Sequence, residues 1–219
     1  MREFCELETD SLAVFLIWNR RAERREVVCG IPDEQFCRGK VPMTKEEVRS
    51  ISISKLRLWK DAVIYDVGAG TGSVAVEMAL QAPDGVVYAV EKNEEAVALL
   101  GENRVAFAVD HLKIVHGKAP EALENLPAPT HVFIGGSSGN LKEILDIVRK
   151  KNKAVRVVIN AITLETVTEA LTYLKEQEIS GAEVVSVQTA RAREVGRYHM
   201  MTGQNPVYVI SFGGERQER

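Results

Sequence analysis

A glycine-rich turn next to an acidic residue is the part of the sequence best suited to bind a small molecule. The apolar run 63–67 contains Asp66 and leads into Gly68, Gly70 and Gly72, after which residues that favour a helix resume. Glycines let the backbone turn sharply and let a ligand lie against the main chain. The helix that follows would present free N–H groups and a partial positive charge to that ligand. The segment is therefore predicted to be a strand, a ligand-binding turn and a helix.

Glu91 is a second acidic residue, and it comes at the end of the next predicted strand, 86–91. In α/β nucleotide-binding folds a carboxylate at this position binds the ribose hydroxyls. The G-x-G-x-G spacing of the turn differs from the G-x-G-x-x-G spacing of dinucleotide folds. Together the two motifs favour a ligand that contains a nucleoside.

These motifs resemble those of the class I S-adenosylmethionine-dependent methyltransferases, and the resemblance extends over about residues 41–212. It implies S-adenosylmethionine as the cofactor. Glu91 would bind the ribose hydroxyls, and Asp66 would orient the glycine turn or the amino group of the cofactor. The methionine end of the cofactor would lie on the turn formed by Gly68, Ala69, Gly70, Thr71 and Gly72.

Five further segments carry a second resemblance, namely 30–33, 42–49, 117–123, 132–137 and 205–210. They resemble segments of a narrower family, the C15-methylating, decarboxylating precorrin methyltransferases of cobalamin biosynthesis. This resemblance implies methylation of C15 of a precorrin or cobalt-precorrin, coupled to the loss of CO2 from an acetate side chain. The partners that it implies are a tetrapyrrole substrate and further copies of the chain, in a homo-oligomer such as a tetramer.

Residues near the start of the resemblance are expected to complete the cofactor site. Thr44, with Glu47 three residues later, forms a capping-box pattern that predicts a helix from about Lys45. Thr44 is expected both to cap this helix and to close over the cofactor.

The adenine side of the site departs from the family pattern. Lys118 stands where the family often has an aspartate that contacts the adenine amino group, so backbone contacts at Gly117 and Ala119 are expected to serve instead. Thr130 stands where an aspartate often begins the fourth strand.

The substrate side is expected at the loops that follow the fourth and fifth strands. Gly136, Ser137 and Asn160 lie in these loops and are expected to face the reacting carbon. A substrate with many carboxylates needs cationic partners, and the candidates between the last two strands are Arg191, Arg193, Arg197 and His199. No acid–base or nucleophilic arrangement stands out, so no catalytic residue is assigned. No metal site is predicted, because the spacing of His111, His116 and His131 supplies no second metal ligand.

Alternating strands and helices must position these loops, and this pattern favours a parallel sheet covered on both faces. The predicted strands are 62–67, 86–91, 112–116, 130–135, 154–159, 182–189 and 205–212, and the predicted helices are 72–81, 93–106, 119–125, 139–151 and 163–177. The fold class is therefore α/β, a Rossmann-like, doubly wound, seven-stranded and mainly parallel sheet. The last two strands are expected to form an antiparallel pair.

Length and composition are those of one main domain with extra segments. Residues 1–29, with a possible strand over Leu12–Trp18, are interpreted as an N-terminal extension or the remnant of a preceding C5-methyltransferase domain. Residues 30–214 are interpreted as the methyltransferase domain and 215–219 as a polar tail. The formal net charge of −3 argues against nucleic acid as the main partner. No membrane span is seen, and the three unpaired cysteines favour the cytoplasm.

Two other functional classes remain open at this point. One is a class I methyltransferase that acts on tRNA or on protein isoaspartate, because these enzymes share the glycine motif. The other is a non-catalytic partner that keeps the fold and binds the cofactor without turnover.

Overall fold

The computed structural model describes residues 29–214 of the 219-residue chain. The strand predicted over Leu12–Trp18 and the tail 215–219 lie outside the described residues. The proposed division of the chain at residues 29 and 214 stays a prediction.

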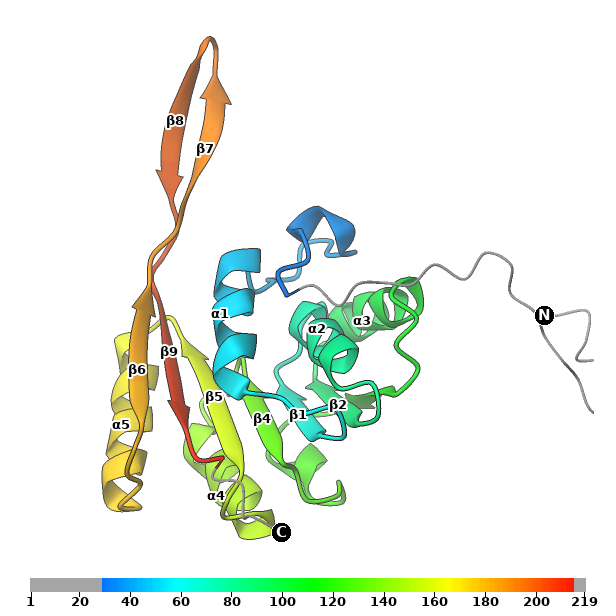
Figure 1. Ribbon diagram of the computed structural model, residues 1–219, viewed down its shortest axis with the longest axis vertical. Helices are drawn as coiled ribbons and strands as arrows, with labels where there is room; N and C mark the ends of the chain where they lie inside the picture. The colour runs from blue at the N-terminus through cyan, green and yellow to red at the C-terminus, as the bar shows by residue number, and fades with distance from the viewer. Residues whose placement is uncertain (1–28, 215–219) are drawn as a thin grey trace, which may run out of the picture.

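The central sheet has seven strands in the order β3-β2-β1-β4-β5-β9-β6 (Figure 1). All neighbouring strands are parallel except β9, which runs antiparallel to both β5 and β6. The predicted fold class, including the C-terminal antiparallel pair, is therefore confirmed. The strands are β1 (Val63–Val67), β2 (Val86–Glu91), β3 (Leu112–His116), β4 (His131–Ile134), β5 (Arg156–Ala161), β6 (Glu183–Val187) and β9 (Val207–Phe212).

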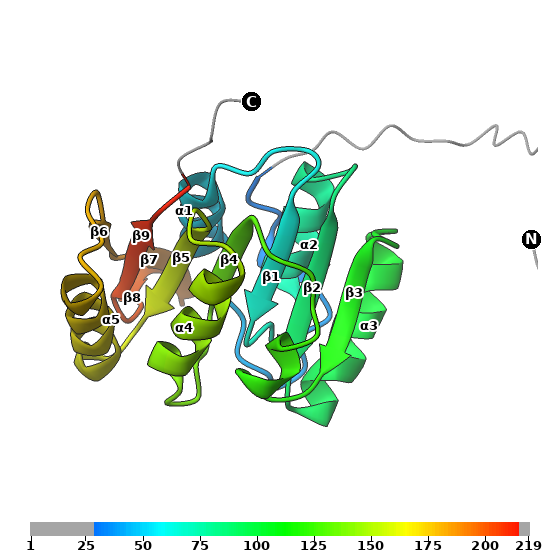
Figure 2. The ribbon, with the colours of Figure 1, turned by 90° about the horizontal axis from the view of Figure 1, so that it is seen from below.

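Within residues 29–214, five α-helices cover the two faces of the sheet (Figure 2). They are α1 (Glu46–Leu56), α2 (Ser73–Gln81), α3 (Glu94–Ala106), α4 (Leu141–Lys151) and α5 (Leu164–Glu176). The described residues also form two short 3-10 helices, η2 (Asp33–Gln35) before α1 and η3 (Glu121–Leu123) between α3 and α4. The helix predicted over 119–125 is wrong, since only η3 forms there. Pro120 and Pro127 lie close on either side of it, and proline both lacks an N–H and disfavours helix in the residue before it.

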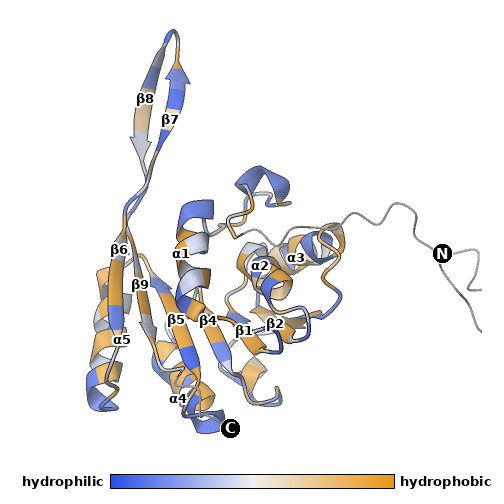
Figure 3. Cartoon of the chain, viewed as in Figure 1, coloured by the Kyte–Doolittle hydropathy of each residue, from blue (hydrophilic) through white to orange (hydrophobic). Residues whose placement is uncertain are grey.

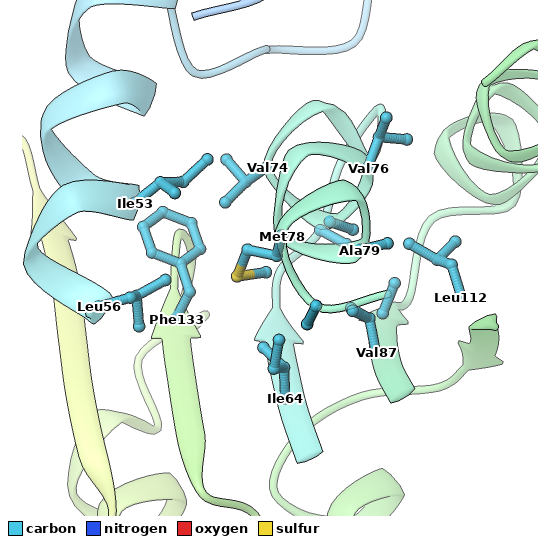
Figure 4. Packing of buried hydrophobic residues seen from close by; sticks show 14 of the residues in the cluster. Ile53, Leu56, Ile64, Val74, Val76, Met78, Ala79, Val87, Leu112 and Phe133 are labelled. Atoms are coloured by element: carbon cyan, nitrogen blue, oxygen red, sulfur yellow. The ribbon is translucent and has the colours of Figure 1, made fainter. Parts of the chain in front are cut away.

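The hydrophobic core is divided into two clusters by the sheet. The first packs α1, α2 and α3 against one face, and the second packs α4 and α5 against the other. In the first cluster Ile53 and Leu56 of α1 lie beside Phe133 of β4, while Met78 of α2 packs over Ile64 of β1 (Figure 4). The central strands are apolar on both sides, as expected for a covered parallel sheet. Packing on both faces holds these strands in place, and the glycine loops begin at their ends.

A long hairpin extends away from the sheet between β6 and β9 (Figure 1). Its strands are β7 (Ala190–Val195) and β8 (Tyr198–Gly203), which pair antiparallel with Val195 opposite Tyr198. The sequence predicted no regular element here. The strands of the central sheet are mostly hydrophobic, whereas the hairpin mixes hydrophilic and hydrophobic residues (Figure 3).

A buried ionic network attaches the segment before α1 to the sheet domain. Arg49 of α1 is fully buried and donates from Nε to Glu77 Oε1 of α2 at 2.6 Å and from Nη1 to Asp33 Oδ1 at 3.2 Å. Glu77 also accepts hydrogen bonds from the backbone N–H groups of Gly30 and Ile31.

The capping role predicted for Thr44 is wrong. The N-cap residue is Lys45, and no side chain of the capping-box pattern bonds to the helix end. Asp33 Oδ1 accepts the N–H of Glu46 at 3.0 Å instead. Asp33, which is distant in sequence, therefore caps α1 in place of Thr44.

Candidate functional site

A cavity of about 580 Å³ lies at the carboxyl ends of β1, β2, β4 and β5, where ligands bind in open parallel sheets. The predicted residues that line it are Thr44, Asp66, Gly68, Ala69, Gly70, Thr71, Glu91, Gly117, Ala119, Gly136, Ser137 and Asn160. Among the described residues, the lining does not include Gly72, Arg191, Arg193 or His199. The structure thus brings most of the predicted residues into one place.

The glycine turn has the backbone conformation that its sequence predicts. The φ values are 74° at Gly68, 56° at Gly70 and 79° at Gly72. Residues other than glycine rarely adopt this backbone conformation. A Cβ atom on Gly68 would lie 2.6 Å from the carbonyl oxygen of Gly136. Gly72 is the N-cap of α2, and a Cβ atom there would lie 1.9 Å from Leu100. The first and last glycines therefore allow close packing, and the turn between them faces the cavity.

Glu91 forms part of the cavity wall and is held by backbone donors. Its Oε2 accepts the N–H of Gly70 at 2.9 Å, and its Oε1 accepts the N–H groups of Lys92 and Asn93 at 2.8 and 2.9 Å. The side chain is thereby fixed at the end of β2, where a ribose would be bound.

Asp66 is fully buried, and neither carboxylate oxygen has a hydrogen-bond partner among the described residues. Burial, with the charge of Glu91 as a second cause, raises the pKa of Asp66 to about 8. Thr71 Oγ1, also in the cavity wall, is likewise buried without a partner in that part of the chain. These polar atoms fit a ligand with a cationic amino group, as in the methionine end of S-adenosylmethionine.

Residues 40–45 form the wall opposite the glycine turn. The carbonyl oxygen of Pro42 would lie 3.1 Å from a Cβ atom on Gly70. The carbonyl oxygen of Thr44 accepts a 2.7 Å hydrogen bond from Arg49 Nη1. The ionic network therefore fixes the position of Thr44 at the cavity.

The adenine side offers fewer free donors than expected. Gly117 and Ala119 both line the cavity, but the N–H of Gly117 donates to the carbonyl oxygen of Glu91 at 2.9 Å. The carbonyl oxygen of Ala119 accepts from Asn140 at 3.2 Å. Thr130 lies away from the cavity, at the start of β4, where its hydroxyl bonds to the backbone of Val63.

The expected substrate residues Gly136, Ser137 and Asn160 also line the cavity. A Cβ atom on Gly136 would meet no described atom within 4 Å, so this position faces open space. Asn160 accepts a 2.9 Å hydrogen bond from Ser52 Oγ of α1. Lys40, Lys45, Lys92 and Lys118 also line the cavity. Lys45 and Lys92 are not among the ligand-binding residues predicted from the sequence, although Lys92 directly follows Glu91 at a strand end.

The four cationic candidates between the last strands, Arg191, Arg193, Arg197 and His199, lie outside the cavity wall. Arg191 donates from Nε to Glu47 Oε1 at 2.8 Å and lies 3.5 Å from Glu46 Oε2. Its hydrogen bond holds the pKa of Glu47 below its usual range. Arg193 and His199 are exposed on the hairpin, where His199 lies 3.6 Å from Glu194. In this chain Arg191 joins the hairpin to α1.

The histidines have structural contacts. His131 is buried against Trp59 and lies 2.8 Å from Thr130 Oγ1, and burial lowers its pKa to about 4. His111 Nε2 lies 2.8 Å from the carbonyl oxygen of Ala79. Across residues 29–214, no group of three or more His, Cys, Asp or Glu side chains is arranged to hold a metal ion. In the same range, no helix has both the length and the apolar character needed to cross a membrane.

Curated relatives match most of this chain. A protein of Pyrobaculum calidifontis, named probable cobalt-precorrin-6B C(15)-methyltransferase (decarboxylating), is 44% identical over 185 residues, which cover 83% of this chain and 94% of the relative. The cobalt-precorrin-6B C(15)-methyltransferase (decarboxylating) of Salmonella typhimurium is 39% identical over 181 residues, which cover 82% and 93%.

Solved structures share the fold. The precorrin-6Y C5,15-methyltransferase structure from Geobacter metallireducens matches with a TM-score of 0.80 and 38% identity, covering 86% of this chain and all of that one. A tRNA (m1A58) methyltransferase from Aquifex aeolicus has a TM-score of 0.65 at 19% identity, a similarity that shows the fold alone. The family model for the precorrin methyltransferase domain matches residues 35–212. The chain therefore belongs to the precorrin methyltransferase family.

Proposed function

We propose that this protein transfers a methyl group from S-adenosylmethionine to C15 of a precorrin or cobalt-precorrin macrocycle and promotes the loss of CO2 from an acetate side chain. The observation that carries this proposal is the similarity to cobalt-precorrin-6B C(15)-methyltransferases (decarboxylating) of 37–44% identity over nearly their whole length. The tRNA alternative has only a shared fold in its favour.

The cavity supports S-adenosylmethionine as the cofactor. Glu91 is positioned to accept hydrogen bonds from the ribose hydroxyls, and the unpartnered carboxyl of Asp66 is suited to the amino group. When bound, the cofactor supplies an electrophilic methyl group on a positively charged sulfur. The protein's part is to hold the macrocycle carbon in line with that methyl group, and orientation of this kind can supply up to about 7–11 kcal/mol of the barrier.

The lysines at the cavity are suited to the carboxylates of the tetrapyrrole. Lys40, Lys45, Lys92 and Lys118 bring positive charge to the walls of a site in an otherwise acidic protein. Long-stemmed ammonium groups can follow flexible side chains of the substrate. We infer that they hold its periphery while Gly136 and Ser137 lie next to the reacting carbon.

We also infer a homo-oligomer, as the family resemblance implies, and a cytoplasmic location, as the unpaired cysteines favour. Large apolar side chains are exposed on the hairpin, including Tyr198, Met200 and Met201. Exposed apolar groups gathered on one protruding element are typical of a contact with another molecule.

The test is turnover of cobalt-precorrin-6B and of cobalt-free precorrin-6B with isotope-labelled S-adenosylmethionine, followed by mass spectrometry. We expect a product that has gained one labelled methyl group and lost one CO2, and we expect no product from Glu91→Ala. Cofactor binding without conversion of either substrate would favour the non-catalytic partner instead.

A further inference from the structure

Asn160, at the end of β5, has an amide group that is only half satisfied. Its Oδ1 accepts a hydrogen bond from Ser52, while its Nδ2 is buried and has no partner within residues 29–214. A buried donor without a partner destabilises the protein unless a ligand satisfies it. Because Asn160 lines the main cavity, the free N–H groups indicate a place for an acceptor on the substrate.

Ser52 contacts the oxygen end of this amide. Its side chain is fully buried, and its Oγ lies 2.8 Å from the carbonyl oxygen of Val48 as well as 2.9 Å from Asn160 Oδ1. A hydroxyl carries one hydrogen, and an amide has an acceptor and a donor end. When Ser52 gives its hydrogen to Asn160, the amide must turn its oxygen toward Ser52, which leaves the NH2 group for a ligand.

A second cavity of about 180 Å³ adjoins the first. The two share Gly135, Gly136, Ser137, Asn160 and Ile162. Within the described part of the chain, the rest of its wall is also uncharged: Ile134, Leu141, Ile159, Ala161, Thr163 and Thr166. Since one water molecule takes about 30 Å³ of the liquid, a carboxymethyl group fits this space. None of these side chains would give a carboxylate placed there a cationic partner.

We propose that this smaller cavity receives the acetate side chain that loses CO2 and that Asn160 Nδ2, oriented by Ser52, donates a hydrogen bond to its carboxylate. The assignment rests on the proposed function and adds residues for its second half. Loss of CO2 turns a charged group into a neutral molecule, so an uncharged wall disfavours the starting state. A cation would stabilise the carboxylate strongly, whereas a neutral amide fixes its direction with a weaker bond.

The step balances without an oxidant or a reductant. Methylation forms a carbon–carbon bond at the macrocycle and breaks the sulfur–methyl bond of S-adenosylmethionine. S-adenosylhomocysteine leaves, and the positive charge passes from the sulfur to the ring system. Cleavage of the bond between the side-chain CH2 and the carboxylate carbon releases CO2 and leaves the bonding electron pair on the CH2 carbon. That pair neutralises the charge through the conjugated system, and only proton shifts within the macrocycle remain. The role of Asn160 therefore belongs to a step that methylation makes possible.

The test measures methyl transfer and CO2 release separately in the full chain. The substrate is cobalt-precorrin-6B labelled with ¹³C in its acetate carboxyls, and the variants are Asn160→Ala, Asn160→Asp and Ser52→Ala. Ser50→Ala is the matched control, because Ser50 Oγ makes the same bond within α1, to the carbonyl oxygen of Glu46 at 2.8 Å, and does not line either cavity. The affinity for S-adenosylhomocysteine reports whether each variant has folded around its cofactor site.

We expect one CO2 per methyl group in the wild type and in Ser50→Ala. The ratio should fall about tenfold in the Asn160 variants, as for a lost oriented hydrogen bond, and severalfold in Ser52→Ala, with cofactor affinity within about twofold of the wild type. A purely structural role would lower both rates together and leave the ratio at one, which would overturn the assignment. Asn160→Asp keeps the side-chain size, so it tests the role of the Asn160 amide in CO2 release if the alanine variant does not fold. A wild type that transfers no methyl group would instead refute the proposed function.

Discussion

The backbone N–H of Gly70 donates a 2.9 Å hydrogen bond to Oε2 of Glu91, so the glycine turn after β1 and the acid at the end of β2 are joined directly. Lys92 and Asn93 donate to the other carboxylate oxygen. The side chain is only 9% exposed. Three backbone donors thus position this carboxylate at the cavity before any ligand is bound, which reduces the ordering cost of binding.

Replacing Glu91 should weaken cofactor binding. Glu91→Gln keeps the size of the side chain but removes the charge that the ribose hydroxyls and the backbone donors share. Hydrogen bonds to charged groups are worth about 1.5–3 kcal/mol, so we expect the Kd for S-adenosylhomocysteine to rise about 10- to 100-fold. Isothermal titration calorimetry measures this change. Glu94→Gln, at an exposed position nearby, is the control, and equal affinity in both variants would contradict the role of Glu91.

Asp66 should make cofactor binding depend on pH. Its pKa of about 8 leaves the carboxyl protonated at pH 7 in the free protein, because burial disfavours the charge. A cationic amino group beside it favours the carboxylate, so binding below about pH 8 releases a proton. We expect the affinity for S-adenosylhomocysteine to rise between pH 6 and 8, by at most about tenfold per pH unit. Calorimetry in buffers of different ionisation enthalpy detects the proton.

The Asp66→Asn variant is the control for this linkage, and it should bind with little dependence on pH. The same shift affects folding. Because the folded pKa lies above the unfolded value of 3.8, the ligand-free protein should lose stability as the pH rises from about 4 toward 8. A flat affinity profile in the wild type would show that Asp66 does not contact the amino group.

The buried network at Arg49 should matter for both stability and binding. Glu77→Gln leaves Arg49 without its 2.6 Å charged partner, and breaking a buried pair typically costs about 3–5 kcal/mol. Lys60→Ala removes an exposed pair with Asp84 and should cost less than about 1 kcal/mol. Urea unfolding measures both. Because Arg49 also holds the carbonyl oxygen of Thr44, Glu77→Gln should further weaken cofactor binding, and stability equal to that of Lys60→Ala would contradict the network's role.

The sequence predicted the seven strands of the central sheet and the ligand-binding edge because the apolar strand pattern and the glycine turn are local signals. It did not predict the network of Asp33, Arg49 and Glu77, whose members are far apart in sequence and meet only when η2, α1 and α2 have packed. The cap of α1 was misassigned for the same reason. A local Thr-x-x-Glu pattern cannot show that the Asp33 carboxylate of η2 accepts the N–H group at the start of α1.

The substrate side was harder to predict than the cofactor side. The position of Asn160 at a strand end follows from the alternation of elements, but its partner Ser52 lies on a helix 108 residues away. Arg191 was selected for its charge, and the structure pairs it with Glu46 and Glu47. Charge alone does not say whether an arginine will meet a substrate or an acidic residue of its own chain.

Two glycines that face each other should respond differently to alanine. Gly136→Ala places a Cβ atom in open space, so we expect the free energy of unfolding to change by less than about 0.5 kcal/mol while methyl transfer falls. Gly68→Ala places a Cβ atom 2.6 Å from the Gly136 carbonyl at a φ of 74°, which should cost at least about 1–2 kcal/mol. Urea unfolding measures the change in stability of each variant, and initial rates measure methyl transfer. Full activity in folded Gly136→Ala would remove Gly136 from the substrate site.

The hairpin should determine the oligomeric state. Met200 and Met201 are 57% and 67% exposed on β8, and an isolated two-stranded hairpin is at best marginally stable in water. Contact with the hairpins of other copies would cover these side chains and stabilise the element. The double variant Met200→Lys, Met201→Lys should therefore lower the mass measured by light scattering from a multiple of 24.3 kDa toward one chain.

The matched control for the hairpin is Leu171→Lys, which adds a charge at an exposed apolar position of α5, 44% exposed, and should leave the mass unchanged. Far-ultraviolet circular dichroism should stay close to that of the wild type in both variants, because the core clusters contain no hairpin residue among those described. Arg191 bonds the base of the hairpin to Glu47 beside the cavity. Dissociation should therefore also raise the KM for the macrocycle more than the Kd for the cofactor. A wild type that is monomeric at micromolar concentration would refute the hairpin's role in assembly.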